Sequence, residues 1–198
     1  LYQPHCYRDN RMGQYEDAFY QKISKEALFK ETGVQPATIN TVLQIYADLQ
    51  EKPHLAEIAE RILFMPDLIN YLLSGVLSSE YTIASSSGLL NIDTQDWSDH
   101  VFEALEIPKK WFGQVTKAGQ VLRMLSPRIT QELKIEPFDV IAGAGHDTAA
   151  AVLAIPYASE DPTAFISCGT WSLVGLESQA PVTSRTALEA GLTNEGCF

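Results

Sequence analysis

Apolar residues recur at helical spacing through the first third of the chain. Between residues 11 and 74 they fall three or four positions apart, which is the spacing of one helix face. Gly33 and Gly75 stand where such helices would end, because glycine readily takes the left-handed conformation that follows a last turn. The pattern therefore predicts several short amphipathic helices, the last of them over residues 67–74. The spacing is seen in Tyr15 with Phe19, in Val42 with Ile45 and Leu49, and in Ile58 with Ile62.

Further along, the pattern changes from helices to a strand, a glycine turn and another helix. Ser98 is a suitable N-cap for a helix that runs through Leu105. Residues 138–142, Phe-Asp-Val-Ile-Ala, are mostly apolar and predict a buried strand. Residues 143–148, Gly-Ala-Gly-His-Asp-Thr, then predict a turn, and an alanine-rich helix should continue to about Ala154. The sequence thus predicts an α/β fold.

Two more apolar runs follow, over residues 164–167 and 172–176. They are separated by Cys-Gly-Thr-Trp and predict a β-hairpin. The polar stretch 156–162, which begins and ends with proline, lies between the alanine-rich helix and this hairpin. It is the expected domain boundary.

Composition and charge exclude several classes of partner. The chain has 198 residues, with 14 Lys and Arg against 25 Asp and Glu, for a net charge of −11. Binding to nucleic acid or to an anionic membrane surface needs clustered cations, so neither is expected as a partner. The longest purely apolar run has 7 residues, well short of the roughly 20 that cross a bilayer. Three cysteines far apart in sequence indicate a reduced, cytoplasmic protein.

The glycine turn is the first candidate for chemistry. Gly143 and Gly145 let the backbone approach a ligand closely, and Asp147 would stand at the start of the following helix. The alternative is purely structural, with Asp147 or Thr148 capping that helix. The turn has neither the third glycine of a dinucleotide-binding loop nor the lysine of a Walker loop.

The second candidate is Gly169-Thr170, between the two strands of the hairpin. A glycine and a hydroxyl there could hold a phosphate through backbone N–H groups, whereas turn statistics alone favour an ordinary hairpin turn. From residue 135 to the end the chain has eight acids and one cation, Arg185. A phosphate held in this segment would depend on amides, the Thr170 hydroxyl or a metal ion.

Near the start of the chain, residues 7–11 read Tyr-Arg-Asp-Asn-Arg. Asp9 and Arg11 could hydrogen-bond a polyol, or the segment could be a solvated turn before a helix. The histidines at 5, 54 and 100 have no second ligand at metal spacing, so no metal site is predicted.

Taken together, the motifs resemble the FGGY carbohydrate kinases. The core of the resemblance is Gly-His-Asp-Thr at 145–148, followed by Ser-Cys-Gly-Thr-Trp-Ser at 167–172. Further matches occur in family order along the whole chain. They are Tyr7-Arg8-Asp9-x-Arg11, Met65-Pro66-Asp67, Glu80-Tyr81-Thr82, Asp96-Trp97, Trp111-Phe112-Gly113, Gly175-x-Glu177-Ser178-Gln179 and Thr193-Asn194-Glu195-Gly196.

The resemblance implies an actin-like, ribonuclease-H-like ATPase fold of two domains that close on a cleft. Residues 1–155 would be part of the N-terminal sugar-binding domain, and residues 156–198 the start of the nucleotide-binding domain. The family transfers the γ-phosphoryl group of ATP to a sugar hydroxyl with Mg²⁺.

The resemblance also assigns roles to individual residues. Asp147 matches the catalytic base, with His146 and Thr148 as sugar contacts on either side of it. Asp9 and Arg11 would line the sugar pocket. Gly169 and Thr170 would contact the nucleotide phosphates.

The chain lacks two parts of the family pattern, the N-terminal Asp-x-Gly-Thr phosphate hairpin and the later C-terminal segments. An internal fragment, inactive by itself, is therefore expected. Two alternatives stay open: a related kinase acting on another ketose or polyol, and a noncatalytic sugar-binding fragment. The oligomeric state is not predicted.

Overall fold

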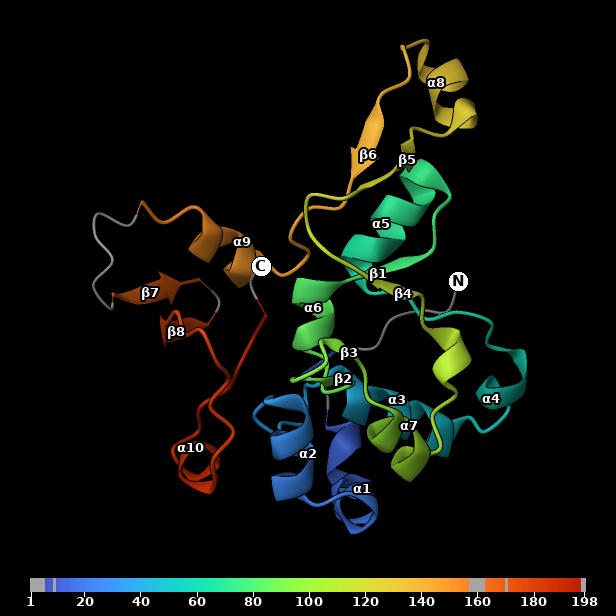
Figure 1. Cartoon of the computed structure of the whole chain (residues 1–198). Helices are drawn as coiled ribbons and strands as arrows, with labels where there is room; N and C mark the ends of the chain where they lie inside the picture. Colours follow the sequence, from blue (N-terminus) through green and yellow to red (C-terminus); the bar gives the residue numbers. More distant parts are fainter. Residues whose placement is uncertain (1–5, 9, 157–162, 170, 197–198) are drawn as a thin grey trace. The chain divides into compact units, whose positions relative to one another are not determined.

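The computed structural model describes residues 6–8, 10–156, 163–169 and 171–196 (Figure 1). The chain forms two compact units. Unit 1 comprises Leu1–Ile62, Ala84–Gly113 and Val182–Asn194, and unit 2 comprises Leu63–Ile83, Gln114–Pro181 and Glu195–Phe198. Each unit is therefore assembled from segments that are distant in sequence. The predicted domain boundary at 156–162 lies almost entirely outside the described residues and stays a prediction.

Unit 1 is mainly helical. A small antiparallel sheet pairs Leu90 with Trp97 and Asn91 with Asp96. Its elements are η1 (Arg11–Gln14), α1 (Glu16–Lys22), α2 (Lys25–Thr32), α3 (Thr41–Glu51), α4 (Leu55–Ile58), β2 (Leu90–Asn91), β3 (Asp96–Trp97), α7 (Asp99–Leu105), η2 (Lys109–Trp111) and α10 (Arg185–Glu189).

Two helix ends of unit 1 lie where the sequence predicts, but the predicted helical pairing of Ile58 with Ile62 is wrong, because α4 ends at Ile58. The Ser98 hydroxyl accepts the backbone N–H of Val101 and caps α7. Gly33 closes α2 with φ 71°, a conformation that disfavours residues with a side chain. Both predictions are confirmed. Helix ends can be predicted from sequence because their capping hydrogen bonds join residues only a few positions apart.

The apolar faces of these helices meet in one core. Phe19 is fully buried and lies edge-on to Tyr46 of α3, with ring centroids 5.4 Å apart. Trp97, Phe102 and Phe112 form a second aromatic cluster with centroid distances of 4.8 to 6.0 Å. Unit 1 thus has a conventional hydrophobic core.

Unit 2 combines helices with three two-stranded sheets. β1 pairs in parallel with β4, and the β5–β6 and β7–β8 pairs are antiparallel. Its elements are α5 (Met65–Ser74), β1 (Ser78–Glu80), β4 (Gln114–Thr116), β5 (Val121–Met124), α8 (Pro127–Leu133), β6 (Asp139–Ile141), α9 (Asp147–Leu153), β7 (Ala164–Cys168) and β8 (Ser172–Leu176). The short helix α6 (Tyr81–Ser85) begins in unit 2 and ends in unit 1.

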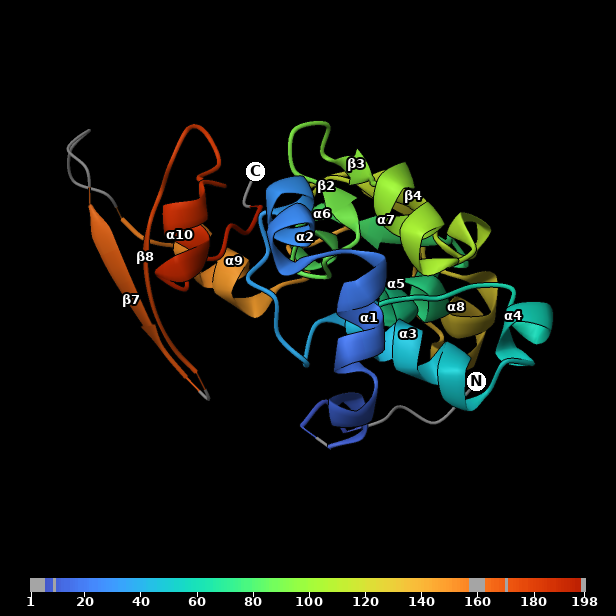
Figure 2. The same cartoon turned by 90° about the horizontal axis from the view of Figure 1, so that it is seen from below.

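Three predictions for unit 2 are confirmed. Helix α5 ends at Ser74 with Gly75 at φ 75°, and it begins at Met65 because Pro66 is well suited to a first turn. The glycine turn leads into α9. The hairpin pairs β7 and β8 in continuous register, with Ile166 opposite Val174 (Figure 2).

The predicted burial of the strand at 138–142 is wrong. β6 forms there, and Val140 and Ala142 are buried, but Phe138 and Ile141 are 56% and 54% exposed. The apolar run predicted a strand covered on both faces. Among the described residues β6 pairs with β5 alone, and this two-stranded sheet leaves alternate side chains exposed.

Within the described part of the chain, no helix combines the length and the apolar character needed to span a lipid bilayer.

Candidate active site

Two fully buried carboxylates join the beginning of α5 to the end of β1. Asp67, in the first turn of α5, accepts the backbone N–H of Glu80 at 3.0 Å to Oδ1 and 3.2 Å to Oδ2. Both side chains are 0% exposed. The pKa of Asp67 is raised to about 7, mainly by burial and also by the charge of Glu80, while the hydrogen bond from the Glu80 N–H lowers it.

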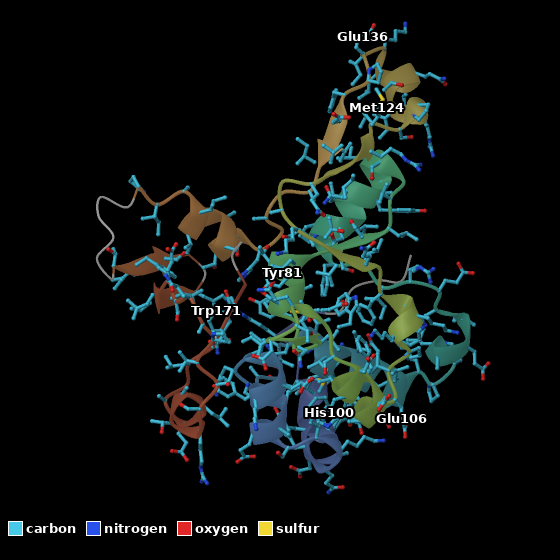
Figure 3. All side chains as sticks on the ribbon, in the orientation of Figure 1. Tyr81, His100, Glu106, Met124, Glu136 and Trp171 are labelled. Carbon is cyan, nitrogen blue, oxygen red and sulfur yellow. The ribbon has the colours of Figure 1, made fainter. Side chains whose placement is uncertain are left out.

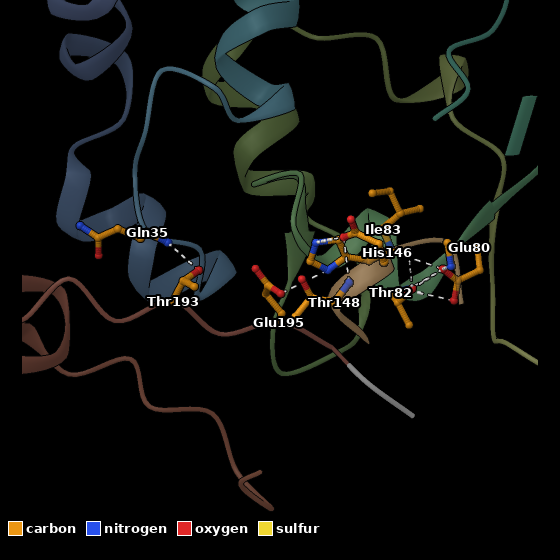
Figure 4. Close-up of polar contacts among 10 residues, drawn as sticks. Gln35, Glu80, Thr82, Ile83, His146, Thr148, Thr193 and Glu195 are labelled. Atoms are coloured by element: carbon orange, nitrogen blue, oxygen red, sulfur yellow. Dashed lines mark hydrogen bonds and ion pairs between the residues drawn. The ribbon is translucent and has the colours of Figure 1, made fainter. Parts of the chain in front are cut away.

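The Glu80 carboxylate reaches from the end of β1 to the glycine turn (Figure 4). It accepts the N–H of Thr82 at 3.0 Å and the Thr82 hydroxyl at 2.6 Å, and so caps the start of α6. The same carboxylate accepts the N–H of Gly145 at 2.8 Å. Glu80 therefore satisfies donors from two segments that are far apart in sequence.

Thr82 makes a second connection to the same turn. Its hydroxyl donates to Glu80 and accepts the backbone N–H of His146 at 3.1 Å. The close approach depends on Gly145, because a Cβ there would lie 3.0 Å from Glu80 Oε2 and 3.1 Å from Ile83 Cγ2. The glycine predicted to admit a ligand is thus also favoured by packing.

His146 is the N-cap residue of α9, and its ring faces Glu195. The Nδ1 atom lies 3.2 Å from Glu195 Oε2, and the imidazole side chain is 18% exposed. The Glu195 carboxylate raises the pKa of His146, and the charges of Asp147 and Glu80 act in the same direction against the effect of burial. This surrounding acidity favours a protonated imidazolium.

Glu195 reaches His146 from a segment that packs tightly on α6. A Cβ at Gly196 would come within 2.4 Å of Tyr81 Cε1, so only glycine fits against that ring. Figure 3 labels Tyr81, which lies in α6 next to Glu80 and Thr82. The close approach of the Gly196 backbone to the Tyr81 ring thus places Glu195 beside His146.

Asp147 is the first residue of α9, and its side chain is 98% exposed. One carboxylate oxygen accepts the N–H of Thr148 at 2.8 Å, and the same oxygen lies 3.6 Å from His146 Nε2. The backbone just before Asp147 is held by the buried side chains of Glu80 and Thr82. The exposed carboxylate that follows can accept a hydrogen bond from a ligand hydroxyl. Of the predicted site residues, the structure brings together His146, Asp147 and Thr148.

Arg11 lies in unit 1 and is engaged with α3. Its guanidinium donates to Asp48 Oδ1 at 2.5 Å and to Gln44 Oε1 at 2.5 Å. Asp9, predicted together with Arg11 to line the sugar pocket, lies outside the described residues. Whether Arg11 contacts a sugar stays a prediction.

Gly169 lies in the turn between β7 and β8. Its N–H donates to the backbone oxygen of Trp171 at 2.9 Å, and Trp171 is 53% exposed beside it (Figure 3). Thr170, predicted to contact phosphate together with Gly169, lies outside the described residues. The nucleotide role of this turn stays a prediction.

No group of three or more His, Cys, Asp or Glu side chains is placed to hold a metal ion in the described part of the chain. Glu80 and Asp67 are committed to backbone N–H groups.

The sequence alone indicates no individual role for Asp67, Glu80, Thr82 or Glu195. Each belongs to a motif that supported the resemblance, but the bonds from Glu80 and Thr82 to the turn join residues 65 and 64 positions apart. No local pattern indicates such a partner. The available signal was the motif Glu-Tyr-Thr itself, because an acidic side chain directly before a helix can accept N–H groups of its first turn.

Comparison with known proteins identifies relatives over the whole chain. The model of the N-terminal domain of the FGGY family of carbohydrate kinases matches residues 1–154. A rhamnulokinase of Bacteroides thetaiotaomicron is 35% identical over 196 residues, which are 99% of this chain and 40% of that protein. A rhamnulokinase of Yersinia pestis is 38% identical over 194 residues, 98% of this chain and 39% of that protein. The chain thus spans about 40% of the length of these relatives.

Solved structures show the same fold. The crystal structure of a carbohydrate kinase from Novosphingobium aromaticivorans superposes with a TM-score of 0.67 at 24% identity, covering 88% of this chain and 37% of that one. The predicted fold class is confirmed: the described residues form part of an α/β, actin-like ATPase fold.

Proposed function

The chain belongs to the FGGY family of carbohydrate kinases, and on that premise we propose that the full-length protein phosphorylates L-rhamnulose to L-rhamnulose 1-phosphate with ATP. The proposal places residues 1–155 in the sugar-binding domain and residues 156–198 at the start of the nucleotide-binding domain. The identity of the sugar is supported by the rhamnulokinases that match 98–99% of this chain. The catalytic assignment depends on one observation: the Asp147 carboxylate is exposed and follows a glycine turn whose Gly145 N–H is hydrogen-bonded to the Glu80 carboxylate.

In the proposed reaction Asp147 is the base. A bond forms between the sugar hydroxyl oxygen and the γ-phosphorus of ATP, the bond from that phosphorus to the β,γ-bridging oxygen breaks, and ADP leaves. The hydroxyl proton passes to the Asp147 carboxylate. Because a carboxylate is far too weak a base to ionise a sugar hydroxyl beforehand, the proton moves late, and Asp147 orients the nucleophile first.

The neighbours of Asp147 are proposed as sugar contacts. His146, with its pKa raised by Glu195, would donate a hydrogen bond to a sugar oxygen, and Thr148 would contribute a hydroxyl. Asp9 and Arg11 are included on the resemblance alone. ATP enters as its Mg²⁺ complex, a substrate, with Gly169 and Thr170 proposed at its phosphates.

The substrate is tested with the full-length protein and a panel of ketoses and polyols that includes rhamnulose, fuculose and xylulose. ADP release is measured at varied sugar concentration. We expect L-rhamnulose to have the highest kcat/KM. A higher value for another sugar would identify a different kinase of the family, and calorimetric sugar binding without any ADP release would identify a noncatalytic protein.

The base is tested with Asp147→Asn in the same full-length protein. We expect kcat to fall by roughly 10²–10⁴-fold, the usual contribution of a positioned base, with sugar affinity changed by less than about threefold. Asp139→Asn is the matched control, because Asp139 is another exposed aspartate of unit 2 and has no proposed role. Turnover by Asp147→Asn at the rate of the control would remove Asp147 from the mechanism.

A further inference from the structure

Two buried side chains hold consecutive backbone N–H groups immediately before Asp147. Glu80 Oε2 binds the N–H of Gly145 at 2.8 Å, and the Thr82 hydroxyl binds the N–H of His146 at 3.1 Å. Both side chains are 0% exposed. They connect the end of β1 and the start of α6 to the turn that precedes α9.

The position of the Asp147 carboxylate depends on this turn. Its side chain is 98% exposed, and the hydrogen bond found for it is to the N–H of its own neighbour, Thr148. The turn contains Gly143 and Gly145, whose backbone has the widest conformational freedom. Helix α9 has 7 residues, too few for a helix to hold its own first turn rigidly.

The Thr82 hydroxyl has two simultaneous roles in the tether. It donates to Glu80 Oε2 at 2.6 Å and accepts the N–H of His146. It thereby also orients the carboxylate that holds Gly145. Removing the hydroxyl would break its hydrogen bond to the His146 N–H. It would also remove one bond that orients the Glu80 carboxylate, and so weaken the hydrogen bond from Gly145 N–H to Glu80.

We infer that Thr82 is a positioning residue for the proposed base, acting through its hydrogen bonds to Glu80 and to the His146 backbone. The inference rests on the proposed function of Asp147. Thr82 touches no reacting atom; it sets where the carboxylate stands relative to the sugar hydroxyl.

The main test compares Thr82→Val, which keeps the side-chain shape and loses the hydroxyl, with Thr82→Ser, which keeps the hydroxyl. In the full-length protein we expect Thr82→Val to lower kcat by about 10- to 100-fold, because misplacing a reacting group by about 1 Å can cost that much. The sugar KM should change by less than about threefold. Thr82→Ser should recover most of the lost turnover.

Hydrogen exchange of the peptide that covers residues 143–148 provides a readout independent of activity. The backbone amide of His146 should exchange faster in Thr82→Val than in the wild type and Thr82→Ser. A structural role alone would lower the Tm and leave kcat per folded enzyme unchanged. That result, with unaltered exchange, would overturn the inference.

A double-mutant cycle separates this inference from the proposed function. If Thr82 acts through Asp147, Thr82→Val should have little effect on the residual turnover of Asp147→Asn. If its full effect persists there, Thr82 does not position Asp147, although Asp147 can still be the base. If Asp147→Asn alone keeps normal turnover, the proposed function fails first.

Gly145→Ala tests the same tether from the other side and serves if Thr82→Val does not fold. The added Cβ would lie 3.0 Å from Glu80 Oε2 and 3.1 Å from Ile83 Cγ2, so these neighbours would have to move by a few tenths of an ångström. We expect a fall in kcat of the same order as for Thr82→Val and the same loss of amide protection. Wild-type kcat together with wild-type exchange would contradict the inference.

Discussion

The two units bury different kinds of side chain. Among the largest described side chains that are less than 2% exposed, the apolar ones, such as Phe19 and Trp111, all lie in unit 1. The remaining three are Asp67, Glu80 and Thr82, and all lie in unit 2. Meanwhile apolar residues of unit 2, such as Ile69 and Phe138, are 52% and 56% exposed.

The buried side chains of unit 1 contribute to stability, whereas those of unit 2 fix the geometry of the proposed site. Burying an apolar side chain is favourable by itself, whereas a buried carboxylate costs free energy unless hydrogen bonds compensate it. Glu80 is compensated by donors from Thr82 and Gly145, so its burial secures the geometry of the glycine turn. Unit 1 is organised around a hydrophobic core, and unit 2 around a polar network beside the proposed base.

The largest expected effect tests the core of unit 1. Phe19→Ala removes a 0% exposed ring that packs against Tyr46 and should lower the free energy of unfolding by about 3–5 kcal/mol. Ile69→Ala, at a 52% exposed position of α5, should stay within about 0.5 kcal/mol. Urea denaturation of the 198-residue chain measures both. An equal decrease in the free energy of unfolding for Phe19→Ala and Ile69→Ala would contradict the difference between the two units.

Asp67→Asn tests the buried carboxylates of unit 2. The pKa of Asp67 is raised to about 7, so its stabilising contribution is present below the unfolded pKa near 4 and is lost as pH rises through 7. Relative to Asp67→Asn, the wild type should therefore lose roughly 3–4 kcal/mol between about pH 4 and pH 8. Urea denaturation at several pH values checks this. A difference between the two proteins that does not vary with pH would contradict it.

The smallest expected effect concerns the ion pair of His146. Glu195→Gln should lower the pKa of His146, because Glu195 is the main cause of its upward shift. The pair should stabilise the wild type by at most about 1 kcal/mol relative to the variant. This advantage is fully present below pH 6.5 and is lost as pH rises through the raised pKa. NMR titration of the imidazole measures the shift, and an unchanged pKa in the variant would exclude Glu195 as its cause.

Much of the region around the proposed base could be predicted from sequence. The glycine turn, the start of α9 at Asp147 and the β7–β8 hairpin follow from glycines, alanines and alternating apolar residues within a few positions of each other. The tether from Thr82 could not be predicted, because its partner His146 lies 64 positions away. The burial of β6 was mispredicted for a similar reason, since an apolar run does not specify which surfaces will cover it.

By itself, the sequence determined the helices, their caps and the family, because these depend on neighbouring residues and on motifs read in order. Ser98 capping α7 and Gly33 closing α2 are examples. Only the tertiary structure decided that Glu80 is buried and that its carboxylate meets Gly145. A hydrogen bond between distant segments forms only when the packing of the whole unit brings them within about 3 Å, and no local pattern encodes that meeting.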